Sequence, residues 1–74
     1  MLIMINEQLK LIGINIKAER LKKNLSQEQL AEMTNISIPT ISLIETGKQN
    51  TSILNILEIA SALGVDVNTL VEGI

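Results

Sequence analysis

The chain is 74 residues long, with 46% hydrophobic residues, 19% charged residues and a formal net charge of −2 at pH 7. This length is enough for one domain with a thin core. The sequence contains no Cys and no His, which excludes a disulfide framework and the usual zinc sites and removes the commonest residues of nucleophilic and acid–base catalysis. We therefore expect a cytoplasmic protein that is not an enzyme and has neither a cofactor nor an evident small-molecule ligand.

The charges are divided unevenly along the chain. Residues 1–48 carry all six basic residues and five acids, a net charge of +1, whereas residues 49–74 carry three acids and no base, a net charge of −3. A basic N-terminal part is suited to contact with phosphate groups. The acidic and apolar C-terminal part is left for another role.

A short apolar run opens the chain at residues 1–5. A membrane-spanning helix needs about 20 such residues, and a signal peptide needs a basic N-terminal region that is missing here. We interpret residues 1–6 as an N-terminal extension that packs on the rest of the chain or on a second subunit, and we expect no membrane association.

The first helix is predicted over about residues 7–23. Leu9, Ile12 and Ile16 give it an apolar stripe at helical spacing. Asn24 tolerates the left-handed conformation that ends many helices, so the helix is expected to stop there.

Two short helices with a tight polar turn between them follow. The run Ser26-Gln27-Glu28-Gln29 fits a capping box and predicts the start of the first of them. Ser37 caps the second, Pro39 falls in its first turn, where a missing N–H is tolerated, and Gly47 ends it. Residues 26–47 thus have the outline of a helix-turn-helix.

The C-terminal part predicts two more helices. Thr51 or Ser52 caps the fourth helix, Gly64 ends it, and a short fifth helix covers about residues 67–72. The apolar stripe expected to face the core from the fourth helix consists of Ile53, Ile56, Leu57, Ala60 and Leu63. The whole chain, residues 1–74, is therefore predicted to be one all-α domain of five helices.

Three stretches resemble the Cro/C1-type (XRE family) helix-turn-helix domains in order and spacing. They read IKAERLKKNLSQEQLA from residue 16, ISLIETGK from residue 41 and ILEIASALGV from residue 56. The resemblance covers residues 12–71 and implies a compact lambda-repressor-like DNA-binding domain. The total length and the run QNTSILNI from residue 49 also resemble, more weakly, the small controller proteins of restriction–modification systems.

The resemblance implies that residues 37–46 form a recognition helix that lies in the major groove of DNA. The residues that would then face the bases are Ser37, Ile38, Pro39, Thr40 and Leu43. The residues expected to contact phosphates are Gln27, Ser42, Thr46, Lys48, Gln49 and Asn50. The alternative for Gln27 is an exposed polar residue of a first turn, and for residues 48–50 an ordinary solvated loop.

Arg20 and Glu45 match family positions that usually pair between the first and third helices. A bidentate guanidinium–carboxylate pair would fix the angle of the recognition helix. The alternative is two unrelated surface charges.

The recognition helix departs from the family pattern at three positions. Ile38, Pro39 and Leu43 stand where relatives commonly carry Arg, Gln or Lys, and none of them can make a bidentate hydrogen bond with a base. Either the protein reads an A·T-rich site through thymine methyl groups and DNA shape, or this apolar surface binds a protein, as in an antitoxin-like module.

A dimer is the expected functional unit. Residues 65–74 carry more apolar side chains than a short last helix can bury, and the corresponding region of the resembled proteins forms a two-fold dimer. Residues 1–5 are able to join this interface. The residues assigned to this interface are Val65, Val67, Leu70, Val71 and Ile74; the alternative is closure of the monomer core. We expect a homodimeric, nucleoid-associated repressor or controller that reads a pseudo-palindromic operator with recognition helices about 34–36 Å apart.

Overall fold

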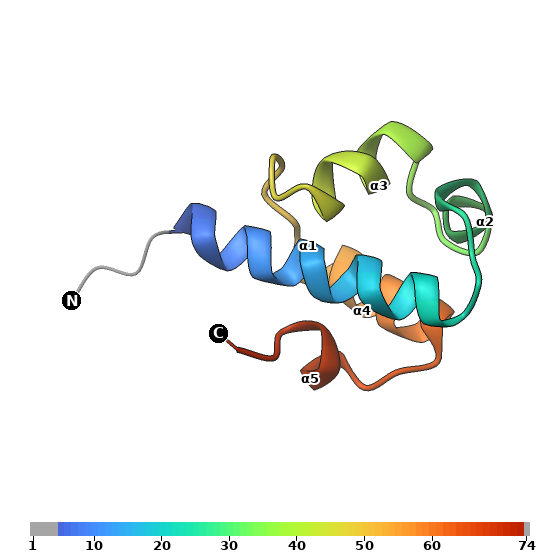
Figure 1. Cartoon of the computed structure of the whole chain (residues 1–74). Helices are drawn as coiled ribbons and strands as arrows, with labels where there is room; N and C mark the ends of the chain where they lie inside the picture. The colour runs from blue at the N-terminus through green and yellow to red at the C-terminus, as the bar shows by residue number, and fades with distance from the viewer. Residues whose placement is uncertain (1–4, 74) are drawn as a thin grey trace.

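The computed structural model describes residues 5–73, which form five α-helices and no strand (Figure 1). The helices are α1 (Ile5–Lys22), α2 (Gln27–Glu32), α3 (Ile38–Glu45), α4 (Ile53–Leu63) and α5 (Val67–Leu70). The predicted all-α fold of five helices is confirmed, although α1 begins two residues earlier than expected and α5 ends at Leu70, two residues earlier than expected. Residues 1–4 and Ile74, which the sequence assigned to the extension and to the dimer interface, lie outside the described residues. None of the helices within residues 5–73 has the length and apolar character needed to cross a membrane.

Side-chain caps fix where three of the helices begin. Ser26 and Gln29 form the predicted capping box, in which the Gln29 N–H donates to Ser26 Oγ (3.0 Å) and the Ser26 N–H donates to Gln29 Oε1 (2.8 Å). Ser37 caps α3 and Ser52 caps α4, each accepting a hydrogen bond from the backbone N–H three residues later. These bonds satisfy N–H groups that have no partner inside the helix.

Three helices end in the same type of C-cap. A left-handed residue follows α1, α3 and α4, with φ of 57° at Asn24, 70° at Gly47 and 69° at Gly64. At each site the next N–H donates to the carbonyl five residues back, as from Lys48 N–H to Leu43 O at 2.9 Å. This is the Schellman motif, and it turns the chain sharply at the points where the sequence predicted helix ends.

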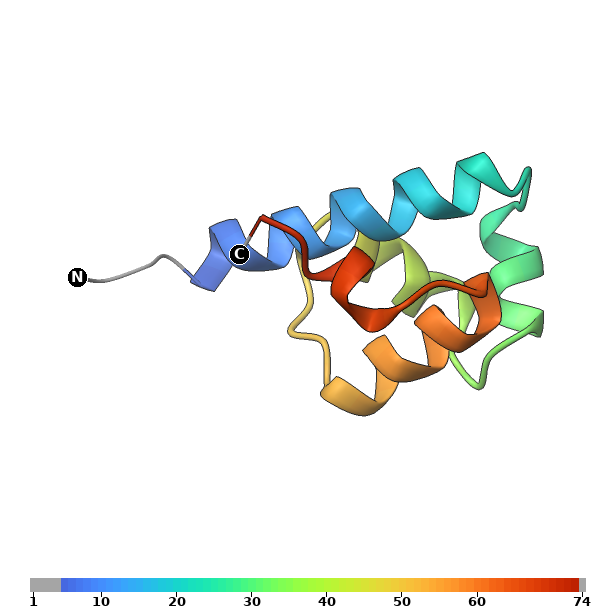
Figure 2. The ribbon, with the colours of Figure 1, turned by 90° about the horizontal axis from the view of Figure 1, so that it is seen from below.

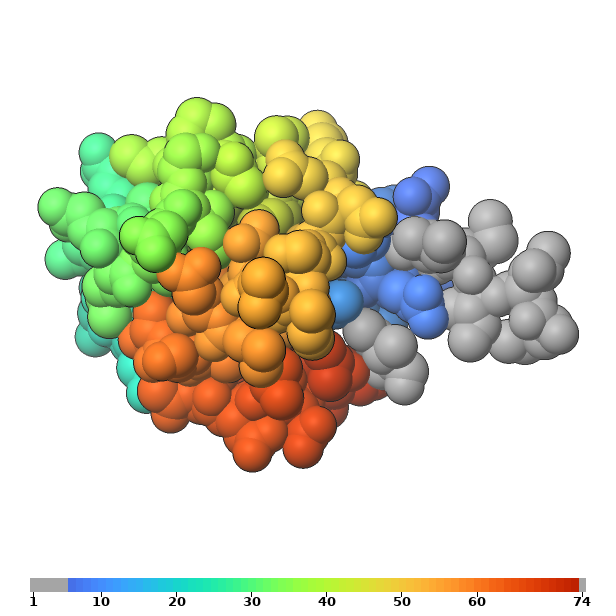
Figure 3. Space-filling view, turned by 180° about the vertical axis from the view of Figure 1, so that it is seen from behind, coloured from blue at the N-terminus to red at the C-terminus, as the bar shows by residue number. Residues whose placement is uncertain are grey.

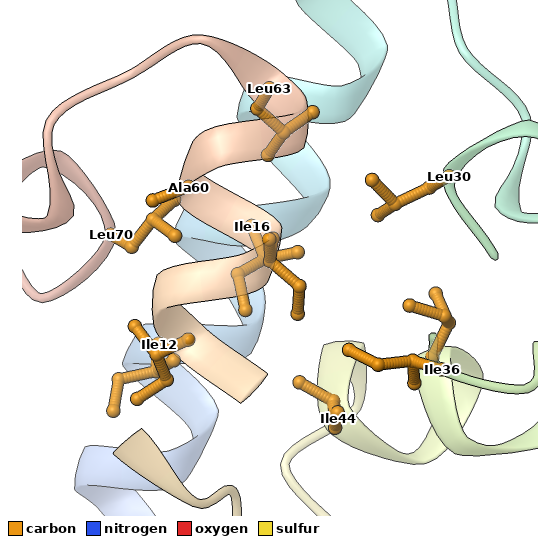
Figure 4. Close-up of a cluster of buried hydrophobic side chains, with 11 residues drawn as sticks. Ile12, Ile16, Leu30, Ile36, Ile44, Ala60, Leu63 and Leu70 are labelled. Atoms are coloured by element: carbon orange, nitrogen blue, oxygen red, sulfur yellow. The ribbon is translucent and has the colours of Figure 1, made fainter. Parts of the chain in front are cut away.

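The core lies where α1 crosses the other helices. Figure 1 shows α3 on one side of α1 and α5 on the other, and Figure 2 shows α1 and α4 on opposite sides of the molecule. The buried hydrophobic side chains, most of them drawn in Figure 4, are Ile12, Ile16, Leu30, Ile36, Ile41, Ile44, Ile56, Ile59, Ala60, Leu63 and Leu70. Burial of each large aliphatic side chain contributes about 1.5–3 kcal/mol to the stability of the fold. In a chain of this size, this small set therefore provides most of the stabilisation.

The segment after α4 closes this core from below. Leu70 is fully buried, and Val65, Val67 and Val71 pack against the core while remaining partly exposed. The side-chain amide of Asn15, on α1, donates to the carbonyl oxygens of Leu70 (3.1 Å) and Glu72 (2.9 Å). The C-terminal segment is therefore fastened to α1 of its own chain.

The backbones of α1 and the end of α3 approach each other closely at Gly13. A Cβ placed on Gly13 would lie 2.5 Å from the carbonyl oxygens of both Ile44 and Glu45. Only hydrogen fits in this gap, so Gly13, which appeared in the sequence as a weak point in a helix, is needed for the contact that sets α3 against α1.

We predict that Gly13→Ala lowers the free energy of unfolding. Helix propensity alone favours alanine by about 1 kcal/mol, but the added methyl group overlaps backbone atoms of α3, and overpacking of this kind typically costs about 1–3 kcal/mol. Urea unfolding followed by circular dichroism measures the difference. The control is Ala18→Gly on the exposed side of α1, which changes propensity without any packing contact and should cost about 1 kcal/mol. A more stable Gly13→Ala protein would contradict the close approach.

Candidate nucleic-acid interface

Helix α3 has one buried face and one exposed face. Ile41 and Ile44 point into the core, whereas Ile38 and Leu43 leave 42% and 40% of their surface exposed. Of the other residues expected to face bases, Ser37 and Pro39 are exposed and Thr40 is half-buried. Four of the five predicted base-facing residues are therefore exposed on α3 and at its N-cap, and Thr40 is partly exposed.

The two hydroxyl groups at the start of α3 bond to each other. Ser37 Oγ donates to Thr40 Oγ1 (2.8 Å) and accepts from the Thr40 N–H (3.3 Å). This arrangement leaves the hydroxyl hydrogen of Thr40 available to donate outward. The hydrogen-bonding groups on this surface are limited to small hydroxyls, because its larger side chains are aliphatic.

A buried ion pair ties α1 to the end of α3. Arg20 Nε donates to Glu45 Oε2 at 2.7 Å and Arg20 Nη2 donates to Glu45 Oε1 at 2.9 Å, while Arg20 Nη1 donates to the carbonyl of Leu25 at 2.7 Å. Both residues are only 6% exposed. The hydrogen bonds to Glu45 raise the pKa of Arg20 above its ordinary value, against the opposing effect of burial. The geometry is the bidentate, charge-assisted type expected for the residues that the sequence singled out as a pair.

Gln27 joins the same network from α2. Its side-chain amide donates to Glu45 Oε1 (3.0 Å), so Glu45 receives hydrogen bonds from residues of two helices. The resemblance implied that Gln27 contacts phosphate, and the half-buried side chain donates at least one amide hydrogen to Glu45 within the protein. Its position in the first turn of α2 links that turn to the end of α3.

The loop after α3 presents the remaining predicted phosphate contacts at the surface. Lys48 and Asn50 are exposed and Gln49 is half-buried, just beyond the Schellman turn at Gly47. Thr46 is exposed, but its hydroxyl already donates to the carbonyls of Ser42 (2.9 Å) and Leu43 (3.2 Å), so a phosphate would have to compete for that hydrogen. Ser42 itself is half-buried on the flank of the helix.

Sequence reasoning missed a carboxylate that holds the turn between α2 and α3. Glu58, on α4, accepts a hydrogen bond from the backbone N–H of Asn35 (3.0 Å) through its Oε2. Within the turn, Thr34 Oγ1 accepts from the Ile36 N–H (3.2 Å). No local signal predicts the contact of Glu58, because 23 residues separate it from its partner.

The structure distributes the C-terminal apolar residues differently from the sequence-based interpretation. Leu70 has no exposed surface to offer a partner, and Val65, Val67 and Val71 pack on their own core. On α4, by contrast, Ile53 and Leu57, expected in the core, are 62% and 46% exposed, and Leu54 between them is 71% exposed. The correction has a simple cause: the side of α4 that carries Ile56, Ile59, Ala60 and Leu63 is the buried one, and Ile53, Leu54 and Leu57 lie outside it. Figure 3 views the molecule from the side on which α4 reaches the surface.

We predict a strongly non-additive stability response at the ion pair. Arg20→Met or Glu45→Met alone leaves one buried charge without its partner, which costs about 3–5 kcal/mol. The double variant removes both charges and replaces them with apolar groups, so it should cost less than the sum of the two single changes. Urea unfolding of the four proteins forms the double-mutant cycle. Additive costs would mean that the two side chains do not act as a pair.

Comparison with known proteins agrees with this geometry. The helix-turn-helix family matches residues 16–70. The control protein C.BamHI of Bacillus amyloliquefaciens is 41% identical over 63 residues, covering 84% of this chain and 78% of that protein. The immunity repressor protein of Bacillus phage phi105 is 38% identical over 60 residues, covering 81% of this chain but only 42% of the repressor.

A solved structure shows the same arrangement of helices. The restriction–modification controller protein C.AhdI from Aeromonas hydrophila superposes with a TM-score of 0.84 at 33% sequence identity, covering 86% of this chain and 97% of the controller. These relatives are regulators and not enzymes, as the composition of the chain predicted. With the family matched across most of its length and the helix-turn-helix geometry in place, this chain belongs to the Cro/C1-type helix-turn-helix family.

Proposed function

We propose that the protein regulates transcription as a homodimer that binds a pseudo-palindromic DNA operator, with α3 of each subunit in the major groove. The observation that carries this proposal is the anchoring of α3. Its inner face is fixed by Gly13 and by the Arg20–Glu45 pair, and within residues 5–73 its outer face stays exposed at Ile38 and Leu43. A rigid helix with an exposed side is the part that a helix-turn-helix protein inserts into the groove.

The exposed side of α3 favours an A·T-rich site. Ile38 and Leu43 are aliphatic and exposed, and aliphatic groups contact the methyl group of thymine in the major groove. Thr40 adds one small hydroxyl that is able to donate to a base or a phosphate. Because no long polar side chain stands on this face, DNA shape and deformability supply the rest of the discrimination.

Phosphate contacts come from the edges of the same surface. Lys48, Gln49 and Asn50 follow α3 directly, and the first turn of α2 at Gln27 lies next to the end of α3 through its bond to Glu45. These groups position the protein without reading sequence. The net negative charge of the chain does not oppose this arrangement, since the basic residues all lie within residues 1–48.

We assign the dimer contact to the first two turns of α4. Ile53, Leu54 and Leu57 form the most exposed apolar group of the described residues, and no charged residue lies between Lys48 and Glu58. An apolar surface suits a second copy, because a two-fold contact sets the same patch of the two subunits against each other and like charges near the axis would repel. This assignment replaces the interface expected from residues 65–74.

The control proteins and the repressor among the relatives favour a role as a repressor or controller that acts at the nucleoid. A protein-interaction module without DNA binding is the second candidate, because Ile38 and Leu43 also form an apolar surface of the type that partners use.

The salt dependence of binding separates these two functions. We expect selection from a random DNA pool to recover a two-fold-symmetric, A·T-rich site. A dimer that makes about 6–10 phosphate contacts should lose about a thousandfold or more in affinity for that site between about 50 and 200 mM salt. Fluorescence anisotropy with the selected duplex measures this loss. Failure to recover any site, or an affinity that does not respond to salt, would favour the protein-interaction module.

Two substitutions distinguish positioning from base reading. Lys48→Ala should weaken binding to all duplexes by a similar factor and reduce the slope of log K against log salt by about 1, because a phosphate contact carries no sequence information. Ile38→Ala should keep that slope and lower the preference for thymine at one position of the selected site. If both variants change sequence preference in the same way, the assignment of the reading face is wrong.

We predict that Leu54→Lys separates the subunits. A charge placed at the centre of a two-fold contact meets its own copy, and loss of a central apolar anchor typically weakens association about 30-fold or more. Sedimentation equilibrium measures the dimer constant, and DNA affinity should fall with it. Ile14→Lys, at an exposed position of α1, the helix that lies on the side of the molecule opposite α4 (Figure 2), is the matched control and should remain dimeric. A dimeric Leu54→Lys protein would rule out the α4 contact.

A further inference from the structure

The outer face of α1 carries an apolar stripe that neither the core nor the proposed DNA and dimer contacts use. The stripe consists of Leu11, Ile14, Ala18 and Leu21, spaced three, four and three residues apart. Leu11, Ile14 and Leu21 are 37%, 59% and 53% exposed, and Ala18 is exposed as well. Spacing of this kind keeps side chains on one line along a helix, over a length of about 15 Å.

This face differs from an ordinary solvated helix surface. The residues that α1 turns inward are Ile12, Ile16 and Arg20, so the core is already supplied from the other side of the helix. An exposed apolar stripe with the spacing of a coiled-coil seam is typical of a surface that packs against a second helix. Figure 2 shows that α1 lies on the side of the molecule opposite α4, so a helix bound here would leave the α4 contact free.

The charges beside the stripe indicate what kind of helix fits. One flank carries Lys10 and Lys17 and no acid. The other flank carries Gln8, Asn15 and Lys22, but there Lys22 is paired with Glu19 at 2.9 Å and Asn15 is bonded to the carbonyl of Glu72. The positive charge beside the stripe is therefore concentrated on the Lys10–Lys17 flank.

A second copy of this chain does not suit the site. Two α1 helices packed in antiparallel fashion through the stripe would set Lys10 and Lys17 against the same lysines of the partner, and parallel packing would set Lys17 against Lys22. Flanking charges decide partner choice between helices in this way, by repelling the wrong partner as well as attracting the right one. We propose that the outer face of α1 docks an amphipathic helix of another protein, one that has aliphatic residues along its seam and Asp or Glu on the side that meets Lys10 and Lys17.

The site goes beyond the proposed function and does not depend on it. A helix bound along α1 occupies neither the exposed side of α3 nor the first turns of α4, so the protein would hold DNA, a second copy and an acidic partner on three different faces. Lys10 lies against Gly47, which puts the Lys10 flank next to the loop that carries Lys48. An acidic partner is therefore close enough to the DNA-facing loop for binding of the two to influence each other electrostatically.

The test uses two synthetic helical peptides of about three heptads with leucine along the seam, one with Glu at both flanking positions and one with Lys there. Each is titrated into the uniformly ¹⁵N-labelled full chain. We expect the Glu peptide to bind, with chemical-shift changes concentrated at residues 10–22, and the Lys peptide to bind at least about tenfold more weakly. Ile14→Lys should lower the affinity for the Glu peptide about tenfold or more, as expected for loss of a central anchor.

Charge reversal and a matched control sharpen the result. The double variant Lys10→Glu/Lys17→Glu should prefer the Lys peptide. Apolar contacts alone would not produce this reversal, because they do not distinguish the two peptides. Leu54→Lys carries the same kind of change on α4 and should bind the Glu peptide as the unmodified chain does. DNA affinity measured on the same samples keeps the two proposals apart, since an unmodified chain that binds DNA but not the Glu peptide contradicts only the docking site.

Several results would overturn the proposal. These are no binding of the Glu peptide, equal binding of both peptides, shift changes centred on α3 or α4, or unchanged affinity in Ile14→Lys. Conversion of Ile14→Lys to a monomer would reassign the stripe to self-association. Binding of the chain to phosphatidylglycerol vesicles through residues 10–22, abolished by Ile14→Lys, would reassign it to an anionic lipid surface.

Discussion

The contact between α1 and α3 determines the direction in which the recognition helix points. Gly13 removes the side chain that would keep the helices apart, and the Arg20–Glu45 pair fixes the distance and angle on the next turns of α1. A buried ion pair adds little net stability once desolvation is counted, so its value here is geometric. Glu45 also holds Gln27, so the relation between α1, α2 and α3 depends on one carboxylate.

A thin aliphatic core makes such orienting contacts important. The core contains no aromatic side chain and consists almost entirely of isoleucine and leucine, which pack well but contribute no directional bonds. Orientation is left to polar contacts at the edges of the core: the Arg20–Glu45 pair at α3, Glu58 at the turn before it and Asn15 at the C-terminal segment. Each of them joins residues that are far apart in the sequence.

Such a small core also leaves much apolar surface outside it. The exposed aliphatic residues gather on three faces, those of α3, α4 and the outer side of α1, and their surroundings differ in charge. The α4 group has one charged neighbour, Glu58, whose carboxylate is bonded to the turn before α3. The α1 stripe runs between lysines, and the α3 group is followed along the chain by Lys48. These differences in charge are the physical basis for proposing a different partner for each face.

The sequence by itself determined the helices and the family, because capping residues, left-handed C-caps and helical periodicity act over a few residues and can be recognised at Ser26, Ser37, Asn24 and Gly64. It also pointed to Arg20 and Glu45 through the resemblance. Tertiary structure alone decided which apolar residues are buried: Leu70 lies in the core and Leu54 outside it, although both are leucines on short amphipathic segments. Hydrophobicity indicates that a side chain favours burial, but whether its own chain covers it depends on where the other helices lie. The long-range hydrogen bonds of Asn15, Gln27 and Glu58 that hold those helices in place form only in the folded chain.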